Sequence, residues 1–277
     1  MMDNLSVLLR IASKVQQRFA PIFFRDPEDR KMDLGLKVAR PDTIDEAIQT
    51  LVLAELGHQS EGWGVVSEEG TIKEGDGKEV LYLDPLDGTY NALNDIPFFS
   101  TSMAVFDGQL NEVTHAVVLN IPSGRIYQGV RGSGSYMGRT RLRTRRRPLK
   151  EAALSVYLGK DGVESLGDIP RRIGRCRYLG CDSLEMCLVA EGSLDGTIHL
   201  GRVPRKTDVA ASLLIVKEAG GEVLSMDNDG NLGPCSINAP WDRVAGIVSF
   251  GDPSLARRLF PRGIANVEPG KEKGDGP

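Results

Sequence analysis

The sequence predicts a mixed α/β fold. Three segments with alternating apolar residues, at 101–106, 112–119 and 124–130, are separated by turn residues and are typical of a β-meander. From residue 153 onward, strand-like segments alternate with helical ones, which is the pattern of an α/β layer. The chain has 277 residues, 40% of them hydrophobic and 26% charged, so it can bury a substantial core in one large domain or two small ones.

Two helices are expected before the meander. Apolar residues at spacings of three and four predict a helix over residues 4–20. A polar loop over 26–42 follows it. Thr43 and Glu46 then match a capping box that opens the second helix, and Gly57 is its expected end.

The second half is expected to contain helices at 163–173, 182–191 and 208–219, and strands at 153–157, 176–179, 195–199, 221–225 and 244–249. The tail combines Pro, Gly and charged residues with little apolar content, which predicts disorder. The predicted organisation is therefore an N-terminal α+β half over 1–150, a C-terminal α/β half over 151–262 and a disordered tail over 263–277.

Composition excludes several classes of protein. A net charge of −4 argues against general nucleic-acid binding, which needs a basic surface. No apolar run approaches the roughly 20 residues that span a bilayer, and no basic region precedes an apolar block at the N-terminus, so neither a membrane anchor nor a secretory signal is expected. The four cysteines form no CxxC pair and no zinc-like spacing with the three histidines. A zinc enzyme and a thiol catalyst are thus disfavoured, and reduced cysteines suit a cytoplasmic protein.

The most basic segment carries seven cationic residues: Arg139, Arg141, Arg143, Arg145, Arg146, Arg147 and Lys150. No aromatic residue lies among them, and the alternate spacing of the first four predicts the solvated face of a hairpin. The alternative is contact with an anionic partner.

The most specific chemistry lies in residues 81–91, with the sequence LYLDPLDGTYN. A buried strand predicted at 79–83 stops at two carboxylates, Asp84 and Asp87, and a Gly-Thr step follows. Pro85 favours an extended Asp84, whose carboxylate would project from the end of the strand, where ligands bind in α/β folds. A divalent cation relieves the repulsion between such carboxylates, and Mg²⁺ prefers carboxylate oxygens, waters and phosphates. The backbone N–H groups of the Gly-Thr step suit a phosphate.

Three further acidic residues are candidates for the same site: Glu68, Asp208 and Asp45. Each feature also has a structural explanation. Asp-Gly is a common turn, an acidic pair before Gly is usually a solvated turn, and an Asp in the first turn of a helix favours the helix dipole. The combination of four acidic sites with one Gly-Thr phosphate cradle favours the functional interpretation.

Spacing excludes two similar motifs. Phosphatases that form an aspartyl-phosphate carry two aspartates two residues apart in DxDGT, whereas Asp84 and Asp87 are three apart. The stretch at 227–231 is similar to a calcium loop, but position 6 is Leu232 rather than Gly and position 12 is Asn238 rather than Glu. We predict a hairpin turn there.

These residues resemble the inositol monophosphatase-like family of Mg²⁺-dependent, Li⁺-sensitive sugar phosphatases, over about residues 5–260. The motif at 84–91 is similar to the family's first signature and the segment at 207–221 to its second. Arg177 and the basic run at 201–206 resemble the archaeal-type enzymes that accept both inositol monophosphate and fructose 1,6-bisphosphate. The resemblance implies a layered α/β/α/β/α sandwich, usually a homodimer.

The resemblance also implies a role for each candidate site residue, with two or three Mg²⁺ ions per subunit. The metal ligands would be Glu68, Asp84, the Leu86 carbonyl, Asp87 and Asp208. The residues that act in catalysis would be Asp45, Glu68 and Thr89. The residues that bind the substrate would be Asp87, Gly88, Thr89, Arg177, Asp182 and Arg202.

The predicted function is hydrolysis of phosphorylated sugars or polyols by a metal-activated water, with inositol 1-phosphate and fructose 1,6-bisphosphate as the implied substrates. The first alternative is a nucleotide phosphatase of the same family, acting on 3′-phosphoadenosine 5′-phosphate or NADP. The second is a non-catalytic binding protein on the same scaffold, against which the presence of every expected ligand residue argues.

Overall fold

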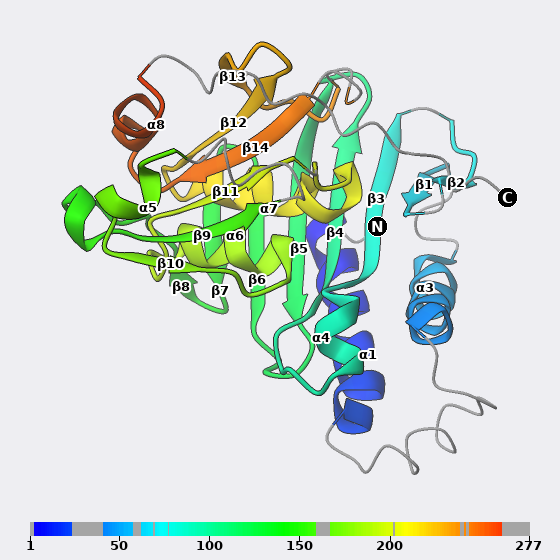
Figure 1. Cartoon of the computed structure of the whole chain (residues 1–277). Coiled ribbons are helices and arrows are strands. Elements are labelled where there is room, and N and C mark those ends of the chain that lie inside the picture. The colour runs from blue at the N-terminus through cyan, green and yellow to red at the C-terminus, as the bar shows by residue number, and fades with distance from the viewer. Residues whose placement is uncertain are drawn as a thin grey trace, which may run out of the picture.

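The computed structural model describes residues 3–23, 41–57, 62–68, 70–76, 78–158, 167–201, 203–238, 241 and 244–261. In this part of the chain, helices and two sheets alternate in five layers (Figure 1). The predicted α/β sandwich is confirmed. Residues 26–40 of the predicted loop, residues 163–166 of a predicted helix and the tail at 263–277 lie outside the described residues.

The first sheet has eight strands in the order β2-β1-β3-β4-β5-β6-β7-β8. They are β1 (Gly64–Ser67), β2 (Gly70–Lys73), β3 (Glu79–Asp87), β4 (Ser100–Asp107), β5 (Glu112–Asn120), β6 (Ile126–Val130), β7 (Gly134–Met137) and β8 (Thr140–Arg141). Only β1 and β3 pair in parallel. The predicted meander is confirmed as β4, β5 and β6, each joined to the next by a short turn.

The second sheet has six strands in the order β10-β9-β11-β14-β12-β13. They are β9 (Ala153–Leu158), β10 (Arg175–Arg177), β11 (Gly196–Leu200), β12 (Glu222–Asp227), β13 (Leu232–Pro234) and β14 (Val244–Phe250). β9 pairs in parallel with both β10 and β11, whereas the other pairs are antiparallel. The turn at 227–231 joins β12 to β13, so the predicted hairpin is confirmed.

The helices are α1 (Asn4–Phe23), α3 (Pro41–Leu56), α4 (Thr89–Leu93), α5 (Ile169–Arg172), α6 (Asp182–Ala190), α7 (Lys206–Glu218) and α8 (Ser254–Leu259), with a 3₁₀ turn at Leu149–Glu151. One expectation about helix ends was wrong. α3 begins at Pro41, so Thr43 lies inside the helix and not at its N-cap; proline suits a first helical turn, where its missing N–H is not needed. Gly57 ends α3 with a left-handed φ of 47°, as predicted.

Three buried clusters hold the layers together. Side chains of α1 and α3, such as Leu8 and Ile48, pack on one face of the first sheet. α6 and α7 fill the space between the sheets, where Ile215 and Met186 are buried. α5 and α8 cover the outer face of the second sheet, with Leu255 fully buried. Because α6 and α7 bury apolar side chains on both sides, the ends of these two helices are held rigidly between the sheets.

The two predicted halves correspond to the two sheets, which the chain joins through residues 142–152. The first sheet ends at Arg141 and the second begins at Ala153, but α7 from the second half contacts β3, β4 and β5 of the first. The boundary at residues 150/151 therefore stays a prediction.

The basic segment is exposed, as predicted, but it is less regular than a hairpin. Strand pairing ends at Arg141, and residues 142–148 belong to no helix or strand. Arg147 reaches the buried Asp195, with Nη1 at 2.7 Å from Oδ2. None of the described helices is long and apolar enough to span a membrane, and all four cysteines are unpaired thiols.

Candidate active site

A cavity of about 440 Å³ lies at the C-terminal end of β3 and the N-terminal ends of α6 and α7. Eight predicted site residues line it: Glu68, Asp84, Leu86, Asp87, Gly88, Thr89, Asp182 and Asp208. Seven residues that were not predicted also line it: Tyr90, Tyr157, Tyr178, Gly180, Val203, Pro204 and Arg205. Residues more than one hundred positions apart in the sequence thus meet in one space.

We expected β3 to stop at Asp84. In the structure it continues to Asp87 through a bulge. Pro85 has no N–H to donate to β4, so the register breaks between the two aspartates. The Leu86 N–H donates instead to Oδ1 of Asp84 at 3.0 Å, and the Pro85 carbonyl accepts a hydrogen bond from Thr101 Oγ1 at 2.8 Å. The bulge therefore fixes both carboxylates in buried positions at the floor of the cavity.

Carboxylates from several elements converge beside this bulge. Oxygen atoms of Asp45 on α3, Glu68 after β1 and Asp84 on β3 lie within 4.8 Å of one another. Burial raises the pKa of Asp84 well above its ordinary value, and four neighbouring carboxylates raise it further: Asp208, Asp87, Glu68 and Asp45. Carboxylates this close do not all ionise unless a cation compensates them, and hard divalent cations prefer such oxygen ligands. The donor set therefore fits a divalent metal site.

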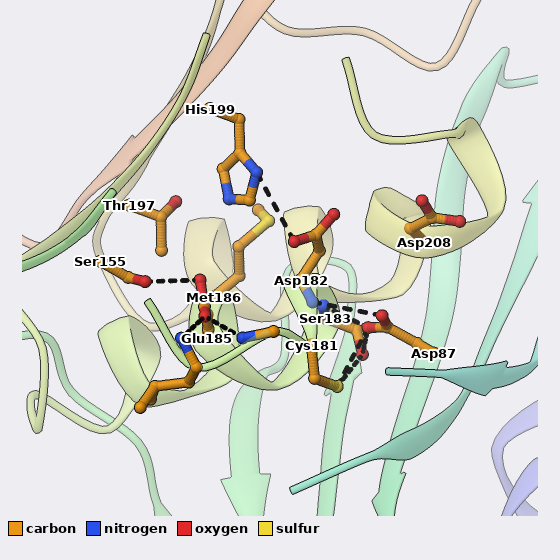
Figure 2. Close-up of polar contacts among 12 residues, drawn as sticks. Asp87, Ser155, Cys181, Asp182, Ser183, Glu185, Met186, Thr197, His199 and Asp208 are labelled. Atoms are coloured by element: carbon orange, nitrogen blue, oxygen red, sulfur yellow. Dashed lines mark hydrogen bonds and ion pairs between the residues drawn. The ribbon is translucent and has the colours of Figure 1, made fainter. Parts of the chain in front are cut away.

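The N-terminal end of α6 holds Asp87 (Figure 2). Oδ1 of Asp87 accepts a hydrogen bond from the Asp182 N–H at 3.2 Å. Oδ2 accepts hydrogen bonds from the Ser183 N–H at 2.7 Å, from Ser183 Oγ at 2.6 Å and from Cys181 Sγ at 3.2 Å. Burial raises the pKa of Asp87 to about 7, and the charge of Asp182 adds to the rise, while the bonds from Ser183 and Cys181 oppose it. These donors fix one orientation of the carboxylate.

Asp208 occupies the first turn of α7, where its two suggested roles coincide. Oδ2 accepts a hydrogen bond from the Arg205 N–H at 2.8 Å, as a helix-capping carboxylate does, and Oδ1 accepts one from Thr207 Oγ1 at 3.1 Å. The same carboxylate lines the cavity, and burial raises its pKa to about 7, with Asp87 as the next largest cause. The Arg205 guanidinium also forms an ion pair with Glu68 across the cavity. Arg205 was missed because only the fold brings the basic run beside Glu68.

Gly88 and Thr89 form the turn from β3 into α4. Gly88 has a left-handed φ of 87°. A Cβ there would lie 3.1 Å from the Gly180 carbonyl oxygen and 3.2 Å from that of Phe98, so only glycine fits. Thr89 Oγ1 donates to the Leu86 carbonyl oxygen at 2.9 Å, which leaves its lone pairs available as acceptors.

The structure places the remaining predicted site residues differently. Asp45 belongs to the carboxylate cluster but is not among the residues that line the cavity. Arg177 is exposed on β10, and its Nη1 donates to the neighbouring Cys176 carbonyl at 2.8 Å; Tyr178 lines the cavity in its place. Arg202 lies outside the described residues. The suggested contacts of Arg177 and Arg202 with the substrate stay predictions.

A second group with suitable spacing for a metal consists of Asp182, Glu185 and His199, whose ligand atoms lie within 4.8 Å of one another. Glu185 is fully buried and already accepts three hydrogen bonds through its two oxygens, from the Leu179 N–H at 2.6 Å, the Gly180 N–H at 2.9 Å and Ser155 Oγ at 2.6 Å. We therefore interpret this group as a hydrogen-bonded support of the cavity wall.

Comparison with known proteins adds an independent observation. A sequence profile described as the inositol monophosphatase family matches residues 5–245. Fructose-1,6-bisphosphatase of Pyrococcus furiosus is 31% identical over 235 residues, which cover 84% of this chain and 88% of that protein. A bifunctional NADP phosphatase/NAD kinase of Methanococcus maripaludis is 30% identical over 244 residues, which cover 80% of this chain and 43% of that protein. The solved structure of the Thermotoga maritima IMPase shares the fold, with a TM-score of 0.74, 24% identity, and coverage of 93% of this chain and 96% of that one.

Proposed function

Because the chain belongs to the inositol monophosphatase family, we propose that it hydrolyses phosphate esters of sugars or polyols with the help of magnesium. Family membership confirms the resemblance drawn from the motif at 84–91 and makes the chain a phosphoric monoester hydrolase. The observation that carries the proposal is the convergence of buried and half-buried carboxylates beside the Gly88–Thr89 turn, at one cavity of about 440 Å³. Inositol 1-phosphate and fructose 1,6-bisphosphate are the proposed substrates, since relatives with about 30% identity carry those activities in their names.

The family depends on metal ions, and we assign Mg²⁺, two or three ions per subunit, to the carboxylate cluster. The proposed ligands are Glu68, Asp84, the Leu86 carbonyl, Asp87 and Asp208. When bound, such ions lower the pKa of a coordinated water and neutralise charge on the leaving oxygen.

The residues of the chain supply orientation. The Thr89 hydroxyl, with its hydrogen committed to Leu86, has only acceptor lone pairs to offer a water, which turns a water proton toward it. The Glu68 carboxylate accepts a hydrogen bond from the second proton of this water. Asp45, which has a carboxylate oxygen within 4.8 Å of one of Glu68, helps to orient the water. The backbone N–H groups of Gly88 and Thr89, together with Asp87, position the phosphoryl group. No covalent enzyme intermediate is required.

A nucleotide phosphatase is the second candidate. The observation that favours it is the 30% identity to a protein named as an NADP phosphatase over 80% of this chain. The metal site would be the same, so the shape of the cavity wall would separate the two activities.

A phosphate-release assay tests the proposal. Inositol 1-phosphate, fructose 1,6-bisphosphate, NADP and 3′-phosphoadenosine 5′-phosphate are compared with and without Mg²⁺ and Li⁺. We expect Mg²⁺-dependent, Li⁺-inhibited release that is fastest from one of the first two. Fastest release from a nucleotide would favour the second candidate. If no ester released phosphate, the result would favour a non-catalytic binding protein. A phosphoenzyme trapped on an aspartate would contradict direct attack by water.

Ser183→Ala is expected to raise the Mg²⁺ concentration needed for half-maximal activity about tenfold, because groups that hold a metal ligand contribute this much to affinity. Ser183 Oγ donates to Asp87 at 2.6 Å, and its loss leaves that carboxylate harder to ionise. The matched control is Ser249→Ala, which removes an equally buried serine hydroxyl whose partner is Thr197. Equal Mg²⁺ requirements in the two variants would contradict the assigned role of Asp87.

We also propose a homodimer, which analytical ultracentrifugation would test, and a cytoplasmic location, which suits four unpaired thiols.

A further inference from the structure

The cavity has one aromatic wall. The chain has six tyrosines, and three of them line this cavity: Tyr90, Tyr157 and Tyr178. The rings of Tyr157 and Tyr178 contact each other, with centroids 4.9 Å apart and planes tilted by 47°. Tyr178 is 54% exposed, so a large part of its surface is accessible from the cavity or from solvent. Aromatic side chains in this position suit contact with a ring.

The ring of Tyr157 packs against the ring of His199. The two rings stack, with centroids 6.0 Å apart and an interplanar angle of 25°. His199 is buried, and its Nδ1 lies 3.5 Å from Oδ1 of Asp182, a contact drawn in Figure 2. Nε2 has no hydrogen-bond partner among the described residues, and an imidazolium would bury an unpaired charged N–H there. His199 is therefore a neutral ring whose Nδ1 faces the carboxylate of Asp182.

Glu185 fixes the second tyrosine. Its carboxylate binds the N–H groups of Leu179 and Gly180, which follow Tyr178 directly, and it also binds Ser155, two residues before Tyr157. One fully buried side chain thus ties together the two segments that carry the aromatic pair. A buried carboxylate is costly unless several donors satisfy it, which fits a positioning role.

The aromatic wall lies next to the phosphate cradle. A Cβ at position 88 would be 3.1 Å from the carbonyl oxygen of Gly180, so the segment that follows Tyr178 passes directly beside Gly88. An ester whose phosphate is held at Gly88 and Thr89 therefore has its alcohol half within reach of the tyrosines. Asp182 lines the same cavity and offers an acceptor for hydroxyl groups.

We propose that Tyr157 and Tyr178 form a platform for the ring of the substrate's alcohol half, so that the enzyme selects cyclic over acyclic phosphate esters. The inference rests on the proposed function. A sugar or cyclitol ring presents a rigid face of C–H groups, which gains dispersion and apolar contact on an aromatic ring. An open-chain polyol must lose its rotational freedom to make the same contacts, so it gains less.

The test is the kinetics of Tyr178→Ala on two esters, inositol 1-phosphate and glycerol 2-phosphate, at saturating Mg²⁺. We expect KM for the cyclic ester to rise about tenfold, the size expected for one lost aromatic contact, with kcat little changed. Kinetics on the acyclic ester should stay as in the wild type. Tyr178→Phe keeps the ring and should restore KM. Tyr136→Ala, a tyrosine of β7 that is not among the residues lining the cavity, is the control for loss of a tyrosine.

Glu185 variants provide a second readout. Glu185→Gln keeps an oxygen for the two backbone donors and can donate to Ser155 Oγ, so its KM values should match those of the wild type. Glu185→Ala should reproduce the defect of Tyr178→Ala on the cyclic ester, with thermal unfolding measured to separate loss of positioning from loss of folding.

Each outcome has a distinct meaning. Equal KM changes on both esters, or no change on either, would overturn the platform while the wild-type activity upholds the proposed function. If the wild-type protein releases phosphate from no ester, the proposed function fails and the platform with it.

Discussion

Asp84→Asn is expected to lower kcat about a thousandfold while it makes the metal-free protein more stable. Asn keeps the oxygen that accepts the Leu86 N–H at 3.0 Å, so the bulge in β3 is preserved. The substitution removes a negative charge where the metal is proposed to bind. The loss of one such electrostatic group lowers kcat by about 10²–10³, and weaker metal binding lowers it further. Phosphate release at saturating Mg²⁺ measures the first effect.

The gain in stability follows from the raised pKa of the cluster. Burial raises the pKa of Asp87 and of Asp208 to about 7, against an ordinary value of 3.8. Between these values the folded, metal-free protein holds protons that the unfolded chain has released. The contribution of these two groups to its stability is therefore fully present below about pH 4 and is lost as the pH rises through 7. Removal of the charge of Asp84 relieves part of that repulsion.

Thermal unfolding in EDTA from pH 4 to pH 8 measures this effect. We expect a melting temperature that falls with pH in the wild type, falls less in Asp84→Asn, and recovers in the wild type when Mg²⁺ is added. A rise of about 3 °C in the variant at pH 7.5 corresponds to roughly 1 kcal/mol for a chain of this size. A wild-type melting temperature that did not depend on pH would contradict the picture of crowded carboxylates.

Asp195→Asn is the matched control. Asp195 is as buried as Asp84, but Arg147 Nη1 lies 2.7 Å from its Oδ2 and the Ala153 N–H donates to the same oxygen. Here the charge is compensated, so its removal should destabilise the protein and leave kcat unchanged. Opposite signs for two buried aspartates would show that the charge of Asp84, unlike that of Asp195, is repelled by its neighbours in the metal-free protein.

The local part of this site could be predicted from the sequence. Asp84, Asp87, Gly88 and Thr89 lie within six residues, and their spacing after an apolar strand was enough to predict a metal site beside a phosphate cradle. The long helices and most strands could also be predicted, because their apolar periodicity reflects which face each element buries, whereas the short helices α4 and α8 were not predicted.

The wall of the cavity could not be predicted in the same way. Glu185 lies in a predicted helix, and a glutamate on a helix usually faces solvent; here α6 lies between two sheets, and Glu185 is fully buried. Arg205 and Tyr157 reach the cavity only because the two sheets pack together, and no local sequence pattern predicts that packing. Pro85 and the bulge that it causes lengthened β3 by four residues beyond the predicted strand at 79–83.

Gly88→Ala is expected to lower kcat/KM about a hundredfold and to destabilise the protein. An alanine at a φ of 87° is strained, which costs about 1 kcal/mol or more. Its Cβ would also lie 3.1 Å from Cys181 Cβ and 3.1 Å from the Gly180 carbonyl oxygen. The neighbours must move, and they belong to the segment that leads into α6 and holds Asp87.

Gly132→Ala separates these two effects. Gly132 has a similar φ of 73°, but nothing lies within 4 Å of the position that its Cβ would occupy. This variant should lose the same stability from backbone strain and keep full activity, because its turn between β6 and β7 is not among the residues that line the cavity. Thermal unfolding and phosphate release on both variants give the comparison. If Gly88→Ala lost stability but kept its kcat/KM, the close packing of the cradle against α6 would have no part in catalysis, and Asp87 would not need the orientation that α6 imposes.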